Sequence, residues 1–73
     1  MIKPPQLPDL SVLVAEASEY QRRLLREALR SASIRKVYEV ADAQAAINAA
    51  VRLTPDVLIL DTDLPGASTL EIM

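Results

Sequence analysis

The sequence predicts an α/β domain in which three parallel strands, in the order 2-1-3, are covered by helices. Short aliphatic stretches alternate with segments of helical periodicity, and the connections between them are short. Such alternation implies right-handed crossovers and therefore a parallel sheet. The apolar fraction is 51%, with no Phe or Trp and only two Tyr, and an aliphatic core of this kind suits helices packed on a parallel sheet.

Three segments are expected as strands. Leu10 to Glu16 and Asp56 to Asp61 contain the most continuous aliphatic runs, which is typical of strands buried on both faces. We expect residues 57–60 to be buried for this reason. Arg35 to Ala41 is less apolar and is expected at an edge, which leaves Leu10 to Glu16 in the centre.

The first helix is expected to begin at Ser18, which forms an S-x-x-Q capping box with Gln21. An apolar stripe on this helix consists of Leu24, Leu25, Ala28 and Leu29. The charged residues fall mostly outside the stripe and are expected on a solvated face. They are Arg22, Arg23, Arg26, Glu27 and Arg30.

Asp42 is expected to cap a second helix that runs to about Leu53. Its apolar face is expected to consist of Ala46, Ile47, Ala50 and Val51, and Thr54-Pro55 ends it. A turn at Leu64-Pro65-Gly66 precedes a third helix expected from Ser68. Residues 1–9 contain three of the five prolines and are expected as an extended tail before a domain spanning residues 10–73.

Composition excludes several classes of function. With no Cys and no His, disulfides, thiolate metal sites and His-based catalysis are ruled out. A net charge of −2 gives no indication of a nucleic-acid surface. The apolar runs are too short to span a membrane, and the N-terminus does not resemble a signal peptide. We therefore expect a cytoplasmic protein.

Acidic residues stand where two strands are expected to end. Glu16 closes the first strand, Asp61 closes the third, and Asp63 follows two residues later. Carboxylates gathered at one edge of a sheet repel each other, and Mg²⁺ would relieve that repulsion. The Asp61 carboxylate is also a plausible nucleophile, since aspartyl phosphates are known intermediates. The alternative, that these are solvated strand-end acids, remains open on spacing alone.

Two segments, VLVAEASEYQRRLLREAL and P-D-V-L-I-L-D-x-x-L-P-G, resemble the receiver domains of two-component response regulators. The resemblance is continuous from about Ser11 to Met73. It implies a flavodoxin-like fold that is not an enzyme, with Asp61 accepting a phosphoryl group from a histidine kinase or phosphotransfer protein. It also implies Mg²⁺ ligands at Glu16, Asp61 and the backbone carbonyl of Asp63, and a turn at Pro65 and Gly66.

The sequence departs from the family pattern in ways that affect function. Ala17 occupies the position of a second acid, so Mg²⁺ binding is expected to be weak. Ala43 and Thr69 replace frequent glycines. Only three of the family's five strands are predicted, and the hydroxyl and lysine that follow strands four and five have no counterpart.

Three hypotheses follow from these departures: an authentic phosphoacceptor domain seen as a fragment, a pseudo-receiver that acts as an interaction module, and an engineered half-domain. In all three, the edge of Asp56 to Asp61 would lack a neighbouring strand. We therefore expect a homodimer with two-fold symmetry that joins these strands, and no contact with nucleic acid or membrane.

Overall fold

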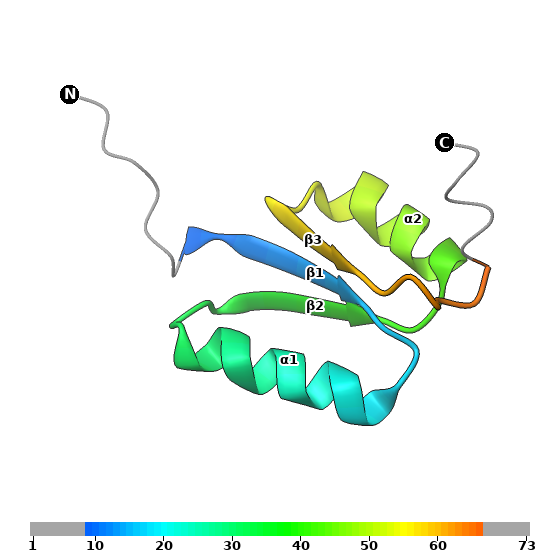
Figure 1. Ribbon diagram of the computed structural model, residues 1–73. Helices are drawn as coiled ribbons and strands as arrows, with labels where there is room; N and C mark the ends of the chain where they lie inside the picture. The colour runs from blue at the N-terminus through cyan, green and yellow to red at the C-terminus, as the bar shows by residue number, and fades with distance from the viewer. Residues whose placement is uncertain (1–8, 67–73) are drawn as a thin grey trace.

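The computed structural model describes residues 9–66. It contains strands β1 (Ser11–Ala15), β2 (Lys36–Val40) and β3 (Val57–Leu60), with helices α1 (Glu19–Ser31) and α2 (Ala43–Leu53) between them (Figure 1). All five elements were predicted, and the ends that the sequence predicts differ from the observed ones by no more than one residue. The third helix expected from Ser68, the glycine position at Thr69, and the proline-rich tail before Asp9 lie outside the described residues.

The three strands form one parallel sheet in the order β2-β1-β3, as predicted. The central strand β1 pairs Leu13 with Tyr38 of β2 on one side and with Leu58 of β3 on the other. The less apolar strand β2 lies at an edge, again as predicted. The two helices lie on opposite faces of the sheet (Figure 1), which is the arrangement that two right-handed crossovers in opposite directions produce.

Side chains of the expected residues cap both helices. The hydroxyl of Ser18 accepts a hydrogen bond from the backbone N–H of Gln21 at 3.2 Å. Asp42 Oδ1 accepts one from the N–H of Ala45 at 2.8 Å. Each bond satisfies an N–H that the first turn of a helix leaves free. The return bond of the predicted capping box, from the Gln21 side chain, is absent among the described hydrogen bonds. Neither helix is long and apolar enough to cross a membrane within the described part of the chain.

The core is centred on β1, where Val12, Leu13 and Val14 are almost completely buried. A cluster of small side chains continues this core toward the carboxyl end of the sheet, and it consists of Ala15, Ala43, Ala46 and Leu64. Because three of its four members are alanines, the backbones of β1 and α2 can approach closely.

The buried faces of the helices differ from the predicted ones. Ala43, Ala46 and Ala49 are the buried residues of α2, whereas Val51 is 73% exposed. Residues 46 and 51 are five positions apart, which places their side chains on different sides of the helix. In α1 no residue is fully buried, and of the predicted stripe only Leu25 and Leu29 are half-buried.

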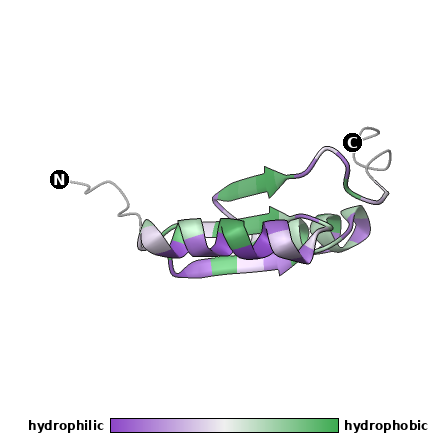
Figure 2. Cartoon of the chain, turned by 60° about the horizontal axis from the view of Figure 1, so that its bottom comes forward, coloured by the Kyte–Doolittle hydropathy of each residue, from purple (hydrophilic) through white to green (hydrophobic). Residues whose placement is uncertain are grey.

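The expected burial of residues 57–60 is also wrong, although they form a strand. Val57, Leu58 and Leu60 are 41%, 46% and 42% exposed. Within the described residues β3 pairs only with β1, and the helices pack mainly on β1 and β2. Figure 2 shows this strand as a strongly hydrophobic element at the side of the sheet away from α1. The aliphatic run therefore forms an exposed apolar edge.

Candidate functional site

Glu16 and Asp61 come together because they follow two adjacent parallel strands. Ala15 is paired with Leu60, so the next residue of each strand emerges at the same edge of the sheet. The backbone holds both in place, since the N–H of Asp61 donates to Ala15 O and that of Glu16 donates to Val40 O, each at 3.0 Å. As predicted, these two acids lie together at the carboxyl edge of the sheet.

The two carboxyl groups share one environment and behave as a pair. A hydrogen bond with Asp61 is the main cause that raises the pKa of Glu16, followed by desolvation and the charge of Asp61. The same hydrogen bond, with one from Asp63, lowers the pKa of Asp61. The buried Glu16 Oε2 has no hydrogen-bond partner among the described residues.

Asp63 contributes its backbone to this site. Its N–H donates to Asp61 Oδ1 at 3.0 Å, while its own side chain is exposed. The N–H of Leu64 donates to the carbonyl of Asp61 at 3.3 Å, which closes a tight turn. Residues 9–66 contain no group of three or more acidic, His or Cys side chains placed to hold a metal ion. The site is thus a pair of carboxylates with a turn beside it, rather than a cluster of three.

The turn after Asp61 is fastened to the start of α2. Leu64 is 2% exposed, and the carbonyl of Pro65 accepts a hydrogen bond from the N–H of Ala43 at 2.9 Å. Gly66 has φ +79°, which favours glycine, and a Cβ there would lie 3.4 Å from the Cβ of Ala43. A small residue at position 43 is therefore what allows this close packing.

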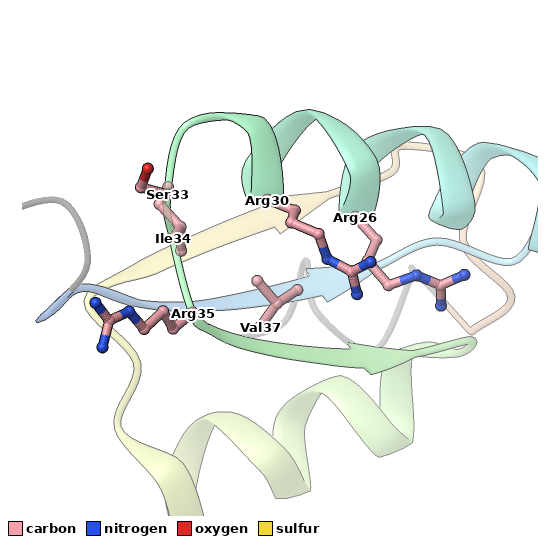
Figure 3. A pocket seen from close by; sticks show the side chains of 6 residues that line it. All are labelled: Arg26, Arg30, Ser33, Ile34, Arg35 and Val37. Carbon is pink, nitrogen blue, oxygen red and sulfur yellow. The ribbon is translucent and has the colours of Figure 1, made fainter.

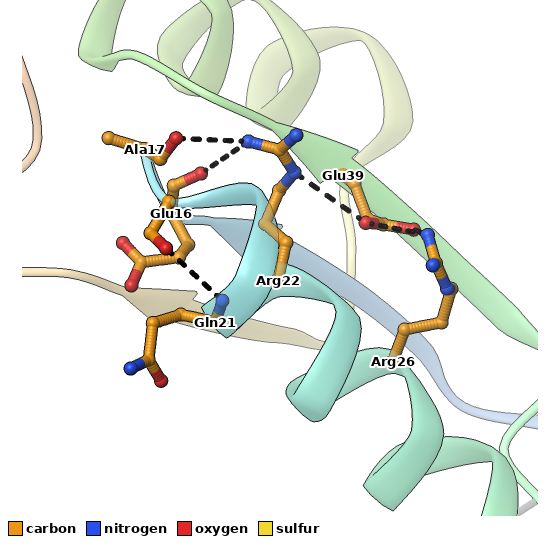
Figure 4. Close-up of polar contacts among 7 residues, drawn as sticks. Glu16, Ala17, Gln21, Arg22, Arg26 and Glu39 are labelled. Atoms are coloured by element: carbon orange, nitrogen blue, oxygen red, sulfur yellow. Dashed lines mark hydrogen bonds and ion pairs between the residues drawn. The ribbon is translucent and has the colours of Figure 1, made fainter.

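Arg22 belongs to the site, although the sequence pattern predicted it on the solvated face of the first helix. Its Nη1 donates to the carbonyls of Glu16 at 2.8 Å and Ala17 at 3.3 Å. Its Nε lies 3.7 Å from Glu39 Oε1, and Glu39 also binds Arg26 (Figure 4). The guanidinium thus ties the loop that carries Glu16 to strand β2. The spacing of six residues, with the Arg in the first turns of the helix after the loop, is a signal that could have indicated this contact.

The fold and site together define a class: flavodoxin-like α/β domains with a site at the carboxyl edge of the sheet. The response regulator receiver domain family matches residues 12–73, and the chain belongs to this family.

A curated relative is the protein-glutamate methylesterase/protein-glutamine glutaminase 5 of Myxococcus xanthus (strain DK1622). The two are 38% identical over 65 residues, which cover 88% of this chain and 19% of the relative. The chain therefore spans about a fifth of the length of the curated relative that it matches. No solved structure gives a significant match.

Proposed function

We propose that this chain is a phosphoacceptor module of two-component signal transduction, in which Asp61 receives the phosphoryl group. The observation that supports this most is the position of Asp61, a carboxylate that lies beside Glu16 at the carboxyl end of β3 and is oriented by the N–H of Asp63. Membership of the receiver family supports the same role. A response regulator of this kind takes its phosphoryl group from a histidine kinase or a phosphotransfer protein, and we propose a cytoplasmic location with such a partner.

The chemistry needs a carboxylate that is ionised and correctly oriented. The N–H of Asp63 holds Asp61 Oδ1 and so orients the carboxylate, whose other oxygen would attack. That oxygen forms a bond to phosphorus while the bond from phosphorus to the donor's imidazole nitrogen breaks, and the electron pair leaves with the imidazole. The backbone bonds of the turn orient the nucleophile before the phosphoryl group arrives.

The residues present fit Mg²⁺, although they supply few oxygen ligands. Glu16 Oε2, buried without a partner among the described residues, is the kind of oxygen that a hard cation satisfies. We propose that Glu16, Asp61 and the backbone carbonyl of Asp63 would hold the ion. When bound, it would neutralise charge on the incoming phosphoryl group. Ala17 supplies no carboxylate at the neighbouring position, so we expect this binding to be weak.

The name of the relative refers to esterase and glutaminase activities, and these belong to that protein. Because the chain covers 19% of it, we propose that residues 12–73 act as a receiver and not as an enzyme. We also propose that the 73-residue chain forms a two-fold homodimer through β3, because the exposed side chains of Val57, Leu58 and Leu60 line that edge.

The test is chemical phosphorylation followed by intact mass measurement. Acetyl phosphate with Mg²⁺ should add one phosphoryl group, and the Asp61→Asn variant should add none. The adduct should be short-lived, because no Lys or Arg forms an ion pair with Asp61 among residues 9–66. Rapid acid quenching is therefore needed. An adduct of equal yield in Asp61→Asn would disprove the assignment.

A second candidate function, an interaction module that works without phosphorylation, is favoured by Ala17 alone. It predicts no adduct even on rapid quenching and in Ala17→Asp. An adduct that appears in Ala17→Asp but not in the native chain would show that the fold keeps the nucleophile but lacks sufficient Mg²⁺ affinity.

A further inference from the structure

The basic residues of this acidic chain are concentrated in one segment, which begins with Arg22 at the site and continues through α1 to the start of β2. Six of the eight Lys and Arg residues lie between positions 22 and 36, with Glu27 as the single acid among them. These residues belong to α1, to the connection after it and to the start of β2. The molecule therefore presents a basic surface although its net charge is −2.

A hollow of about 410 Å³ lies in this region between α1 and β2. We call it the arginine groove, and its lining residues are Arg26, Arg30, Ser33, Ile34, Arg35 and Val37. Figure 3 shows Arg26 and Arg30 reaching from α1 toward β2, with Val37 rising from the strand beneath them. Its volume is within the range of sites that accept a few side chains or a small ligand.

The arginines of the groove differ in how far their charge is already neutralised. Arg26 binds both oxygens of Glu39 at 3.2 and 3.0 Å. Arg30 and Arg35 form no ion pair within residues 9–66, whereas Arg23 on the same helix pairs with Glu27. Two exposed guanidinium groups thus remain available to carboxylates or phosphates beside a half-buried apolar floor of Ile34 and Val37.

The neighbouring strand offers a second kind of contact. β2 is an edge strand that pairs only with β1 among the described elements, so its outer N–H and C=O groups face away from the sheet. An extended peptide can pair with such an edge and place alternate side chains over the adjoining surface. Basic side chains beside the edge, namely Arg35 and Lys36, would favour a peptide that carries negative charge.

We propose that the arginine groove and the outer edge of β2 bind an extended acidic segment of a partner protein. Its backbone pairs with β2, its carboxylates contact Arg30 and Arg35, and its aliphatic side chains cover Ile34 and Val37. A long polyanion such as RNA fits less well, because the chain as a whole is acidic and has only two aromatic side chains for stacking. This inference does not depend on phosphorylation of Asp61.

The experiment measures binding of a synthetic fluorescent peptide to the whole chain by fluorescence anisotropy. The probe alternates Glu and Val over roughly eight residues, about the length of one strand, and a matched probe alternates Lys and Val. The Glu–Val probe should bind, and the double variant Arg30→Gln/Arg35→Gln should weaken it about tenfold. The double variant Arg23→Gln/Arg52→Gln, which has the same net charge, should change affinity less than about twofold.

Hydrogen exchange tests the strand pairing in the same complex. Amides of Lys36–Val40 should exchange more slowly with the Glu–Val probe bound. The proposal is overturned by any of four results: no binding, equal loss in both double variants, equal affinity for the Lys–Val probe, or binding without slower exchange in β2. Displacement of the probe by inorganic phosphate would overturn the proposal in favour of an anion site. Displacement by single-stranded RNA at a lower concentration than the unlabelled Glu–Val peptide needs would overturn it in favour of a nucleic-acid site. Circular dichroism of all variants checks that the fold is retained.

Discussion

At the scale of single residues, Arg22 shows how a side chain outside the acidic pair organises it. It is 21% exposed and contacts two carbonyls of the loop that carries Glu16, whereas its neighbour Arg23 is 66% exposed. The two arginines are adjacent in sequence and on the same helix, so they form a natural comparison. Only the first can reach back over the start of the helix to the loop.

Replacing Arg22 by Gln should destabilise the chain by about 1–2 kcal/mol, because charge-assisted hydrogen bonds to two carbonyls and the contact with Glu39 are lost. Arg23→Gln should change stability by less than about 0.5 kcal/mol, since its pair with Glu27 is exposed. Urea unfolding followed by circular dichroism measures both. Equal stability of the two variants would mean that Arg22 does not support the loop.

Restoring a carboxylate at position 17 should strengthen Mg²⁺ binding. Ala17 is exposed beside Glu16, so Ala17→Asp adds an oxygen ligand without disturbing the core. We expect at least about tenfold tighter binding, or 1.4 kcal/mol, in a calorimetric titration. Ala41→Asp is the control, because it adds the same charge just after the neighbouring strand β2. Native affinity equal to that of Ala17→Asp would contradict this role for position 17.

Asp56 and Ser11 predict a measurable pH dependence at the opposite end of the sheet. The N–H and hydroxyl of Ser11 donate to Asp56 Oδ2 at 2.8 and 3.1 Å, and these bonds lower the pKa of Asp56. A carboxyl whose pKa is lower in the folded chain stabilises it above the unfolded pKa, about 3.9, and this contribution is lost as pH falls through the folded pKa.

Ser11→Ala should therefore lose stability near neutral pH and show a smaller further loss on acidification than the native chain. Ser31→Ala is the matched control, since its hydroxyl donates to the Glu27 carbonyl and to no carboxylate. Urea unfolding at several pH values between neutrality and the acidic range measures the difference. Because the backbone N–H remains in Ser11→Ala, an unchanged acid dependence would show that the hydroxyl bond does not contribute to the lowered pKa of Asp56.

The sequence allowed the acidic pair to be predicted but not its arginine. Glu16 and Asp61 each follow an aliphatic run, and in a parallel sheet the ends of adjacent strands meet at one edge. The contact of Arg22 depends on how a long side chain folds back over the first turn of α1, and hydrophobic periodicity contains no information on that. The spacing of acids suggested a third carboxylate at Asp63, whereas the family resemblance assigned its role to the backbone. The turn directs that backbone toward Asp61 and leaves the side chain exposed.

At the scale of elements, α2 and the turn after β3 form one unit. The N–H of Ala43 donates to the carbonyl of Pro65, and the Ala43 side chain is buried beside Gly66, so this position favours a small side chain. Both the start of the helix and the turn that follows Asp61 depend on this packing.

Ala43→Leu should destabilise the chain by about 1–3 kcal/mol, because added methylenes must displace the turn or the buried Leu64. Gln44→Leu, at the exposed neighbouring position of the same helix, should change stability by less than about 0.5 kcal/mol. Thermal and urea unfolding measure both, and NMR shifts of residues 61–66 should change only in the first. A native-like spectrum for Ala43→Leu would contradict tight packing of the turn.

The elements were predicted better than their orientation. Strand and helix types follow from the change between continuous aliphatic runs and helical spacing. The buried face of α2 was misassigned because alanines occur at five of its eleven positions, so several overlapping stripes are equally apolar. The stripe of smallest side chains faces the sheet, since it permits the closest approach, and the branched Val51 is left outside.

At the scale of the whole molecule, the apolar edge of β3 is the feature on which the proposed association depends. The strand order was predicted correctly from relative apolarity, but the prediction that β3 is buried was wrong. An aliphatic run indicates that a strand needs cover on both sides, and it contains no information on whether the described part of the chain supplies that cover. The exposed fractions of Val57, Leu58 and Leu60 show how much of this strand is left uncovered.

The 73-residue chain should therefore associate, with β3 strands of two copies adjacent and antiparallel. Sedimentation at several concentrations should show dimers whose fraction rises with concentration. Leu58→Lys should weaken association, whereas Leu24→Lys on α1 should not, although the two leucines are 46% and 44% exposed. A monomer at all concentrations, or equal association of the two variants, would rule out an interface between the β3 strands.

The central position of β1 also sets an order of events during synthesis. Both neighbours of this strand are made after it, and Ser11 meets Asp56 across 45 positions of sequence. At roughly 5–20 residues per second, a ribosome needs about 2–9 seconds to extend the chain that far. Throughout that interval the most deeply buried strand of the sheet has no partner on one side, and a chaperone that recognises extended aliphatic segments has time to bind it. The nascent chain thus passes through a period in which β1 is incompletely paired, and the length of this period is set by topology rather than by composition.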